Sequence, residues 1–234
     1  MINHCCMSNV GRGFIGDLQI VRATKDIKEG TELTFWYHVP DGSDIYENMR
    51  NRLKHWGFEC NCRLCQEAQA ISKKQKKQRD GLFADLKATL EDQHRLDHDK
   101  AERLITALTR TYKSPSVEVP RLRLALAYIA LAEAYYFRGA FFRAASMAVR
   151  SLTSYGFVIE GVENSLPGIQ LAIVQEWGLM TEHVVQAWIM LRSICQRVGS
   201  TSLSQVDMHA RTAYMICYGE QASFEKVVVL DRGT

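Results

Sequence analysis

The sequence predicts an α+β protein, in which a β-rich N-terminal part is followed by an all-α part. Three observations lead to this prediction. Residues 1–40 combine turn residues with runs of β-branched and aromatic residues, which is typical of short strands. Three cysteines lie within residues 60–65, a density that favours a metal site over core packing. Beyond Ser72, apolar residues recur at helical spacing.

Two strands are expected in the first forty residues. The first contains Leu18, Ile20 and Ala23 and follows a Gly-Asp turn. The second is the run Leu-Thr-Phe-Trp-Tyr at 33–37, which should end at a Pro-Asp-Gly turn. The Gly-Arg-Gly sequence at 11–13 lacks a preceding strand and a following helix, so a plain loop is expected there and not a phosphate-binding loop.

A helix is expected to follow, with Ser43 as its N-cap and Gly57 at its end. Four apolar residues would share one face of this helix, at positions i, i+4, i+8 and i+11: Ile45, Met49, Leu53 and Trp56. The cysteine cluster comes directly after it.

The all-α part is expected to contain at least five helices. Leu82, Leu86 and Leu90 repeat at helical spacing, and only the valine run at 227–229 suggests a strand. Small and aromatic residues within 131–148 follow the spacing of a tetratricopeptide-like pair, in which small side chains let two antiparallel helices approach closely. A generic helical hairpin explains this spacing equally well.

Composition and charge limit the classes of function. The 234 residues carry a formal net charge of +3, too small to indicate a nucleic-acid partner, and no apolar stretch is long enough to span a membrane. The basic run at 73–79 is expected to be a solvated helix face or linker. An exposed helix end is expected for a second polar cluster, formed by His94, Asp97, His98 and Asp99. Without a secretory signal, the protein is expected in the cytoplasm and/or the nucleus.

The cysteines predict a zinc site. A thiolate site needs four ligands in a tetrahedron, and Cys60, Cys62 and Cys65 supply three of them. In a reducing compartment such a cluster binds a metal more often than it forms disulfides. Residue types leave the fourth ligand open among five candidates: His4, Cys5, Cys6, His38 and His55.

Three segments resemble the SET family of protein methyltransferases, in both order and spacing. Asn-His-Cys-Cys-Met-Ser-Asn at 3–9 resembles the SET signature Asn-His-Ser-Cys-x-Pro-Asn, with Cys5 and Ser8 replacing serine and proline. Residues 16–37 are similar to the strand-turn-strand that follows, and residues 56–65 to the post-SET segment. The remaining helices resemble, more loosely, the C-terminal domains of MYND-containing and fungal tetratricopeptide-containing SET proteins.

The resemblance implies methyl transfer from S-adenosylmethionine to a lysine side chain of a protein substrate, with histones among the candidates. Residues 1–66 would be the C-terminal part of a SET domain with its post-SET zinc site, 67–81 a basic linker or helix start, and 82–234 a tetratricopeptide-like helical domain. The helical domain would offer a surface to a protein partner. Neither a membrane nor direct contact with nucleic acid is expected.

The resemblance also implies the roles of individual residues. Tyr37 would be the catalytic tyrosine, and Asn3, His4 and Phe58 would bind S-adenosylmethionine, with Phe58 stacked on the adenine ring. Zn²⁺ would be held by four cysteines, three late in the motif and one early: Cys6, Cys60, Cys62 and Cys65.

One departure from the SET pattern suggests an alternative function. The N-terminal half of the fold, with its glycine-containing cofactor loop, does not precede the signature. We therefore expect an N-terminally truncated methyltransferase, with sheet edges and apolar surface uncovered in residues 1–40. The alternative is a non-catalytic, zinc-stabilised SET remnant with a helical protein-interaction domain. Binding of the cofactor would distinguish these two functions.

Overall fold

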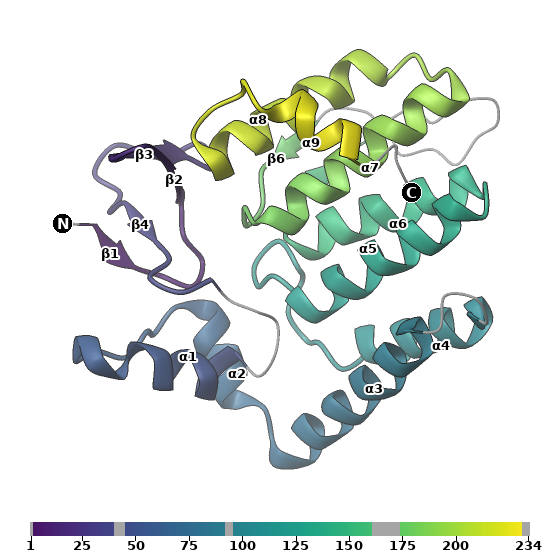
Figure 1. The fold of residues 1–234 in the computed structure, drawn as a ribbon. Coiled ribbons are helices and arrows are strands. Elements are labelled where there is room, and N and C mark those ends of the chain that lie inside the picture. The colour runs from purple at the N-terminus through teal and green to yellow at the C-terminus, as the bar shows by residue number, and fades with distance from the viewer. Residues whose placement is uncertain (1, 40–44, 92–95, 161–173, 231–234) are drawn as a thin grey trace.

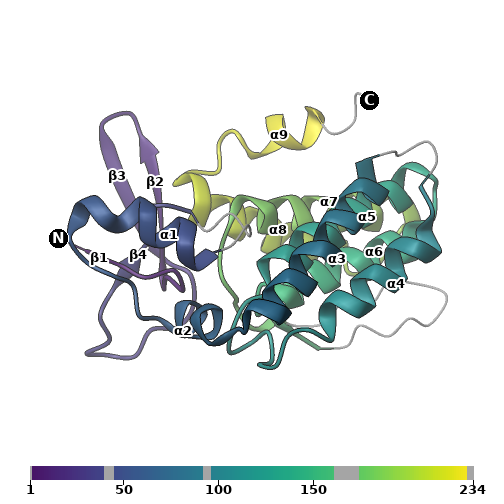
Figure 2. The ribbon, with the colours of Figure 1, turned by 90° about the horizontal axis from the view of Figure 1, so that it is seen from below.

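The computed structural model describes residues 2–39, 45–91, 96–160 and 174–230, which form two lobes (Figure 1, Figure 2). One lobe holds the N-terminal strands and the first two helices, and the other is a stack of helices. Within the described residues the strands form three two-stranded sheets. This mixed content confirms the predicted α+β class.

The N-terminal strands form two of these small sheets. β1 (Asn3–His4) pairs in parallel with β4 (Thr34–Phe35), and β2 (Val10–Ile15) pairs antiparallel with β3 (Leu18–Ala23). β3 and β4 confirm the two predicted strands, although β4 covers only two residues of the run 33–37.

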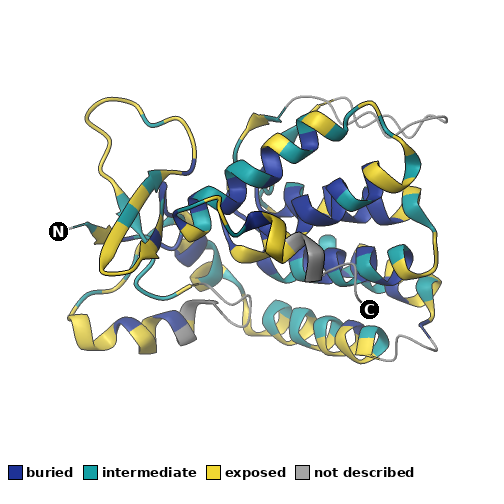
Figure 3. Ribbon diagram, turned by 45° about the horizontal axis from the view of Figure 1, so that its top comes forward, coloured by how far each residue is buried: buried dark blue, intermediate teal, exposed yellow. Residues whose placement is uncertain are grey.

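Apolar side chains are exposed at the outer end of the β2–β3 hairpin. Phe14 is 62% exposed and Leu18 is 66% exposed, and Figure 3 shows much of this hairpin in the colour of exposed residues. The expectation of uncovered apolar surface within residues 1–40 is confirmed for these side chains.

The Gly-Arg-Gly sequence at 11–13 lies inside strand β2, so the prediction of a loop is wrong. Glycine is required because α8 (Leu203–Tyr218) ends against this strand, and a Cβ atom at Gly13 would lie only 2.5 Å from the carbonyl carbon of Tyr218. Arg22 on β3 adds a hydrogen bond of 3.2 Å to the carbonyl oxygen of Gly219. The two lobes therefore meet backbone to backbone.

The predicted helix before the cysteines is formed by α1 (Ile45–Leu53) and the 3-10 helix η1 (Lys54–Trp56). It ends at Gly57, whose φ of 75° is left-handed. Met49 and Leu53 are buried as predicted, whereas Trp56 is 43% exposed because the tighter turn of η1 rotates it off the buried face. Ser43 and the side chain of Ile45 lie outside the described residues. α2 (Arg63–Ala70) follows the cysteine-containing loop.

The helical lobe confirms the prediction of at least five helices. Leu86 is fully buried, and Leu82 and Leu90 pack beside the core, as their spacing predicted. Besides α8, the helices beyond Ser72 are α3 (Lys73–Glu91), α4 (His98–Thr109), α5 (Leu122–Phe137), α6 (Phe141–Ser154), α7 (Glu182–Val198) and α9 (Phe224–Leu230).

The valine run at 227–229 belongs to helix α9, so the predicted strand there is wrong. Phe224, the first residue of α9, is fully buried and packs on Tyr214 of α8 with ring centroids 5.4 Å apart. Glu225 forms an ion pair with Arg211 of α8. These tertiary contacts outweigh the β-propensity of valine. Two short strands that were not predicted, β5 (Val158–Ile159) and β6 (Val174–Glu176), pair antiparallel.

Helices α5 and α6 form a closely packed hairpin. Its turn contains Gly139 at a φ of 72°, and the Ser151 hydroxyl donates a hydrogen bond of 2.8 Å to the carbonyl oxygen of Ala125. Four alanines of the pair are fully buried: Ala125, Ala132, Ala144 and Ala148. The hairpin is thus confirmed, and its tetratricopeptide-like character stays a prediction.

Two further expectations concern the helices. The Asp97 side chain accepts a hydrogen bond of 2.9 Å from the Lys100 backbone, so Asp97 caps α4 and the predicted helix end is confirmed. His94 lies outside the described residues. In the part of the chain that the structure describes, no helix combines the length and apolar character needed to cross a bilayer.

We expect Gly13→Ala to destabilise the protein by about 1–3 kcal/mol, because the added Cβ would overlap the backbone at the end of α8. Gly81→Ala is the matched control, since a Cβ at Gly81 in α3 would have no neighbouring heavy atom within 4 Å, and alanine there should stabilise the helix by about 1 kcal/mol. Urea denaturation measures both changes. A Gly13→Ala protein as stable as the wild type would contradict the close approach of the lobes.

Candidate functional site

Four cysteine side chains converge between the two segments of the strand lobe. Cys6 follows β1, Cys62 occupies the N-cap of α2, and Cys65 lies in the first turn of that helix. The sulfur atom of Cys6 lies 3.8 Å from that of Cys60 and 3.6 Å from that of Cys65. All four sulfur atoms lie within 4.8 Å of one another. Residues separated by 54 or more positions are thereby brought to one point.

This spacing fits a zinc ion. Zinc binds thiolates at about 2.3 Å in a tetrahedron, which places its sulfur ligands about 3.8 Å apart. Cys6 and Cys65 are fully buried, as expected for a closed structural site. The cluster joins Cys6, one of the candidates for the fourth ligand, to the three late cysteines. Cys5 is also hydrogen-bonded with Cys62, and its sulfur accepts a hydrogen bond of 3.3 Å from the Met7 backbone.

Hydrogen bonds within the cluster shift the pKa values of its thiols in opposite directions. Hydrogen bonding with the Cys60 side chain raises the pKa of Cys6, whereas hydrogen bonding with Cys5 lowers the pKa of Cys62 to about 3. Zinc requires thiolates, so metal binding would release any protons that these sulfurs carry.

His4 lies between the cysteine cluster and Tyr37. Its side chain is buried, and its Nε2 atom lies 3.4 Å from the sulfur of Cys6. On the opposite side of the ring, Nδ1 accepts a hydrogen bond of 3.1 Å from the backbone N–H of Tyr37. Both ring nitrogens are thus engaged within the protein.

Tyr37 lies just beyond β4, in a group of aromatic rings. Its hydroxyl donates a hydrogen bond of 3.1 Å to the carbonyl oxygen of Ile2. Its ring centroid lies 5.5 Å from that of His4, 5.2 Å from that of Trp56 and 6.0 Å from that of Phe58. The structure therefore brings together three of the predicted site residues, Tyr37, His4 and Phe58, and adds Trp56, which the sequence analysis had assigned only to a helix face.

Asn3, the other predicted cofactor contact, is exposed on β1 and donates a hydrogen bond of 2.6 Å to the Glu32 carboxylate. The roles of Asn3, His4, Phe58 and Tyr37 in binding and catalysis stay predictions. Asn9 was not among the predicted site residues. Its side chain accepts a hydrogen bond of 2.8 Å from the Thr34 N–H and donates one of 2.8 Å to the Glu32 carbonyl oxygen. Its place as the last residue of the 3–9 signature was the signal for this linking role.

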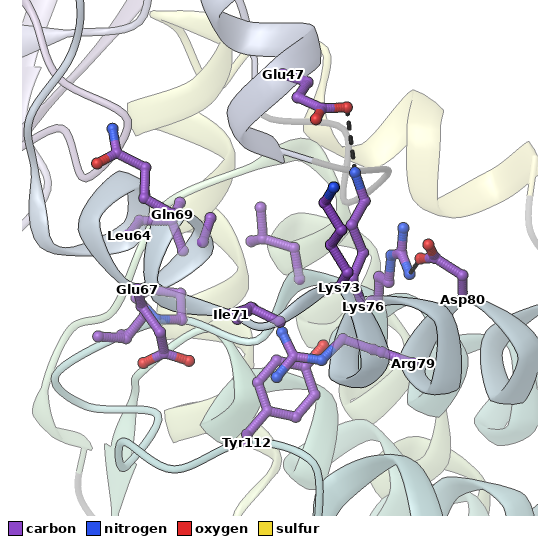
Figure 4. Close-up of a pocket in the computed structure, with 15 residues that line it drawn as sticks. Glu47, Leu64, Glu67, Gln69, Ile71, Lys73, Lys76, Arg79, Asp80 and Tyr112 are labelled. Carbon is purple, nitrogen blue, oxygen red and sulfur yellow. Dashed lines mark hydrogen bonds and ion pairs between the residues drawn. The ribbon is translucent and has the colours of Figure 1, made fainter.

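A separate pocket of about 540 Å³ lies between α1, α2, α3 and the loop before α5, and contains none of the predicted site residues (Figure 4). Several charged groups in it are engaged within the protein. Lys76 pairs with Glu47 at 3.1 Å, and Arg79 lies 3.8 Å above the ring of Tyr112. The basic run at 73–79 thus forms the first turns of α3, in agreement with the predicted helix face.

Two comparisons with known proteins found similar sequences. Residues 1–38 match the family model of the SET domain. Over 228 residues, or 97% of this chain, the sequence is 31% identical to a Gibberella zeae protein named "Methyltransferase". The chain spans 31% of the length of that relative. The chain is thus similar to the SET domain at its N-terminal end and to part of a longer protein named methyltransferase.

We expect Cys62→Ser to lose zinc and to unfold the strand lobe, because three thiolates and a hydroxyl hold the metal poorly. Metal analysis of the purified variant, together with circular dichroism, tests this. Cys5→Ser should keep one zinc per chain, as should Cys217→Ser, a control on α8 in the other lobe. Unchanged zinc content in Cys62→Ser would disprove the assignment of this ligand.

Proposed function

We propose that this chain contributes to an S-adenosylmethionine-dependent protein-lysine methyltransferase of the SET type. The observation that carries the proposal is the placement of Tyr37. Tyr37 and Ile2 both lie within the residues that match the SET domain, and the Tyr37 hydroxyl donates a hydrogen bond to the Ile2 carbonyl oxygen. Phe58 and the four cysteines that fit zinc lie nearby. The similarity to a longer protein named methyltransferase supports the same activity.

The aromatic group suits the chemistry of the cofactor. When bound, S-adenosylmethionine supplies a methyl group on a positively charged sulfur. Aromatic faces attract cations and stack on flat heterocycles, so Phe58 and the ring of Tyr37 suit the two ends of this cofactor. Asn3 would contact its polar atoms from the exposed edge of β1. His4 would contribute main-chain atoms, because both ring nitrogens are engaged elsewhere.

Tyr37 and Ile2 would orient the lysine amine. A neutral amine reacts when its lone pair faces the methyl group at near-attack distance. The Tyr37 hydroxyl gives its hydrogen to the Ile2 carbonyl and keeps lone pairs, so both oxygens can accept amine hydrogens from one small volume. Holding the two hydrogens there directs the lone pair away from these oxygens and toward the methyl group. Neither oxygen needs to change its charge.

The helical lobe would recruit a protein partner or substrate. The α5–α6 hairpin, with its buried alanines, supports a tetratricopeptide-like arrangement of residues 82–234. Histones are among the candidate substrates. Because a thiolate zinc site needs reduced cysteines, the proposed location is the cytoplasm and/or the nucleus.

The first test is calorimetric titration of S-adenosylhomocysteine into the zinc-loaded chain. We expect binding in the micromolar range. Absence of binding would refute a cofactor pocket in this chain and favour the alternative of a zinc-stabilised, non-catalytic SET remnant. Heat from titration of adenosine alone gives the control for unspecific stacking on exposed rings.

We expect Tyr37→Phe to lower kcat for methylation of core histones by about 10²-fold or more, because one oriented oxygen is removed from the reacting amine. Affinity for S-adenosylhomocysteine should change little, since the phenyl ring keeps its stacking contacts. Tyr112→Phe, in the separate pocket, is the matched control. Mass spectrometry of the product identifies the methylated residue. Full activity of Tyr37→Phe would exclude the role assigned to its hydroxyl.

A further inference from the structure

His4 connects the cysteine cluster to Tyr37 through both of its ring nitrogens. A backbone N–H can only donate, so the contact of 3.1 Å with the Tyr37 N–H makes Nδ1 an acceptor. A neutral imidazole then carries its proton on Nε2, the atom that lies 3.4 Å from the sulfur of Cys6. The tautomer follows from these two contacts, and the direction of donation runs from Tyr37 to His4 to Cys6.

Zinc on Cys6 would favour this arrangement. A zinc-bound cysteine is a thiolate, which accepts hydrogen bonds and has no proton to donate. The thiolate would accept a hydrogen bond from Nε2–H, and Nδ1 would stay the acceptor that holds the Tyr37 backbone.

The surroundings leave little freedom to His4. Its side chain is 9% exposed, and its ring lies 5.5 Å from that of Tyr37 and 5.9 Å from that of Phe58. β1 pairs His4 with Phe35 on β4, two residues before Tyr37. A change in the hydrogen bonds of the imidazole is thus passed to the end of β4 and cannot be absorbed by solvent.

We infer that His4 is a positioning residue that couples occupation of the four-cysteine zinc site to the placement of Tyr37. This inference differs from the cofactor contact that the family resemblance implied for His4. The inference rests on the proposed function only where it treats the position of Tyr37 as important. The coupling itself is a property of the backbone and the cysteine cluster. It is measured without any methyl transfer.

Two substitutions separate the two hydrogen bonds. The side-chain oxygen of asparagine can take the place of Nδ1, so His4→Asn keeps an acceptor for the Tyr37 N–H but does not reach Cys6. The side-chain nitrogen of glutamine can take the place of Nε2, so His4→Gln keeps a donor to Cys6 but loses the acceptor at Tyr37. His183→Gln, in the first turn of α7, is the matched control.

The readouts are zinc affinity, by competition with a chelating dye, and hydrogen exchange of the Tyr37 amide in zinc-loaded protein labelled with ¹⁵N-tyrosine. We expect His4→Asn to weaken zinc binding by about tenfold or more while Tyr37 keeps its protection. We expect His4→Gln to keep zinc affinity within about twofold while the Tyr37 amide exchanges about tenfold faster. At saturating zinc, His4→Asn should regain kcat and His4→Gln should not.

A merely structural His4 gives a different pattern, in which both variants weaken zinc and Tyr37 protection to the same extent. That result would overturn the inference, as would two variants that change neither readout. If the exchange pattern is as expected but the protein transfers no methyl group, the proposed function is disproved and the inference about His4 stands.

Discussion

The convergence of four cysteine sulfurs is the constraint on which the strand lobe depends. Each N-terminal sheet has only two strands, and such sheets are marginally stable alone. A hydrogen bond contributes about 1 kcal/mol net, whereas structural zinc contributes about 10 kcal/mol or more in small zinc-binding peptides. Zinc at this cluster would therefore contribute more to the free energy of folding than any single contact among β1, β4 and α2. It would join the start of the chain to a segment 54 residues later.

The same closure builds the aromatic group around Tyr37. Phe58 lies between the left-handed turn at Gly57 and Cys60, so the cysteine cluster fixes its distance from His4. The Trp36 indole also donates a hydrogen bond of 3.1 Å to the Cys6 carbonyl oxygen. The cysteine cluster and Tyr37 thus belong to one hydrogen-bonded unit. Zinc at the cluster would in this way influence the position of Tyr37 without touching it.

The helical lobe supports the strand lobe through a close approach of α8 to the backbone of β2. Gly13 permits it, because any side chain at that position would overlap the end of α8. The partner helix is in turn fixed by packing within its own lobe, where α8 contacts α7 and the buried Phe224. A change in the packing of the helical core would therefore shift β2. This strand leads into β3 and then into the run at 33–37 that carries Tyr37.

The sequence by itself determined the α+β class, the helix that ends at Gly57, the helices beyond Ser72 and three members of the cysteine cluster. These features depend on local periodicity, turn chemistry and ligand spacing, which are all present in short stretches of chain. Tertiary structure alone decided that 11–13 is a strand, that 227–229 is helical, and that His4 faces a sulfur and an amide. Each of these depends on a partner in another element of the fold: α8 for the glycines, Tyr214 and Arg211 for α9, and Tyr37 for His4. Local patterns carry no information about such partners, because the contact exists only once the chain has folded.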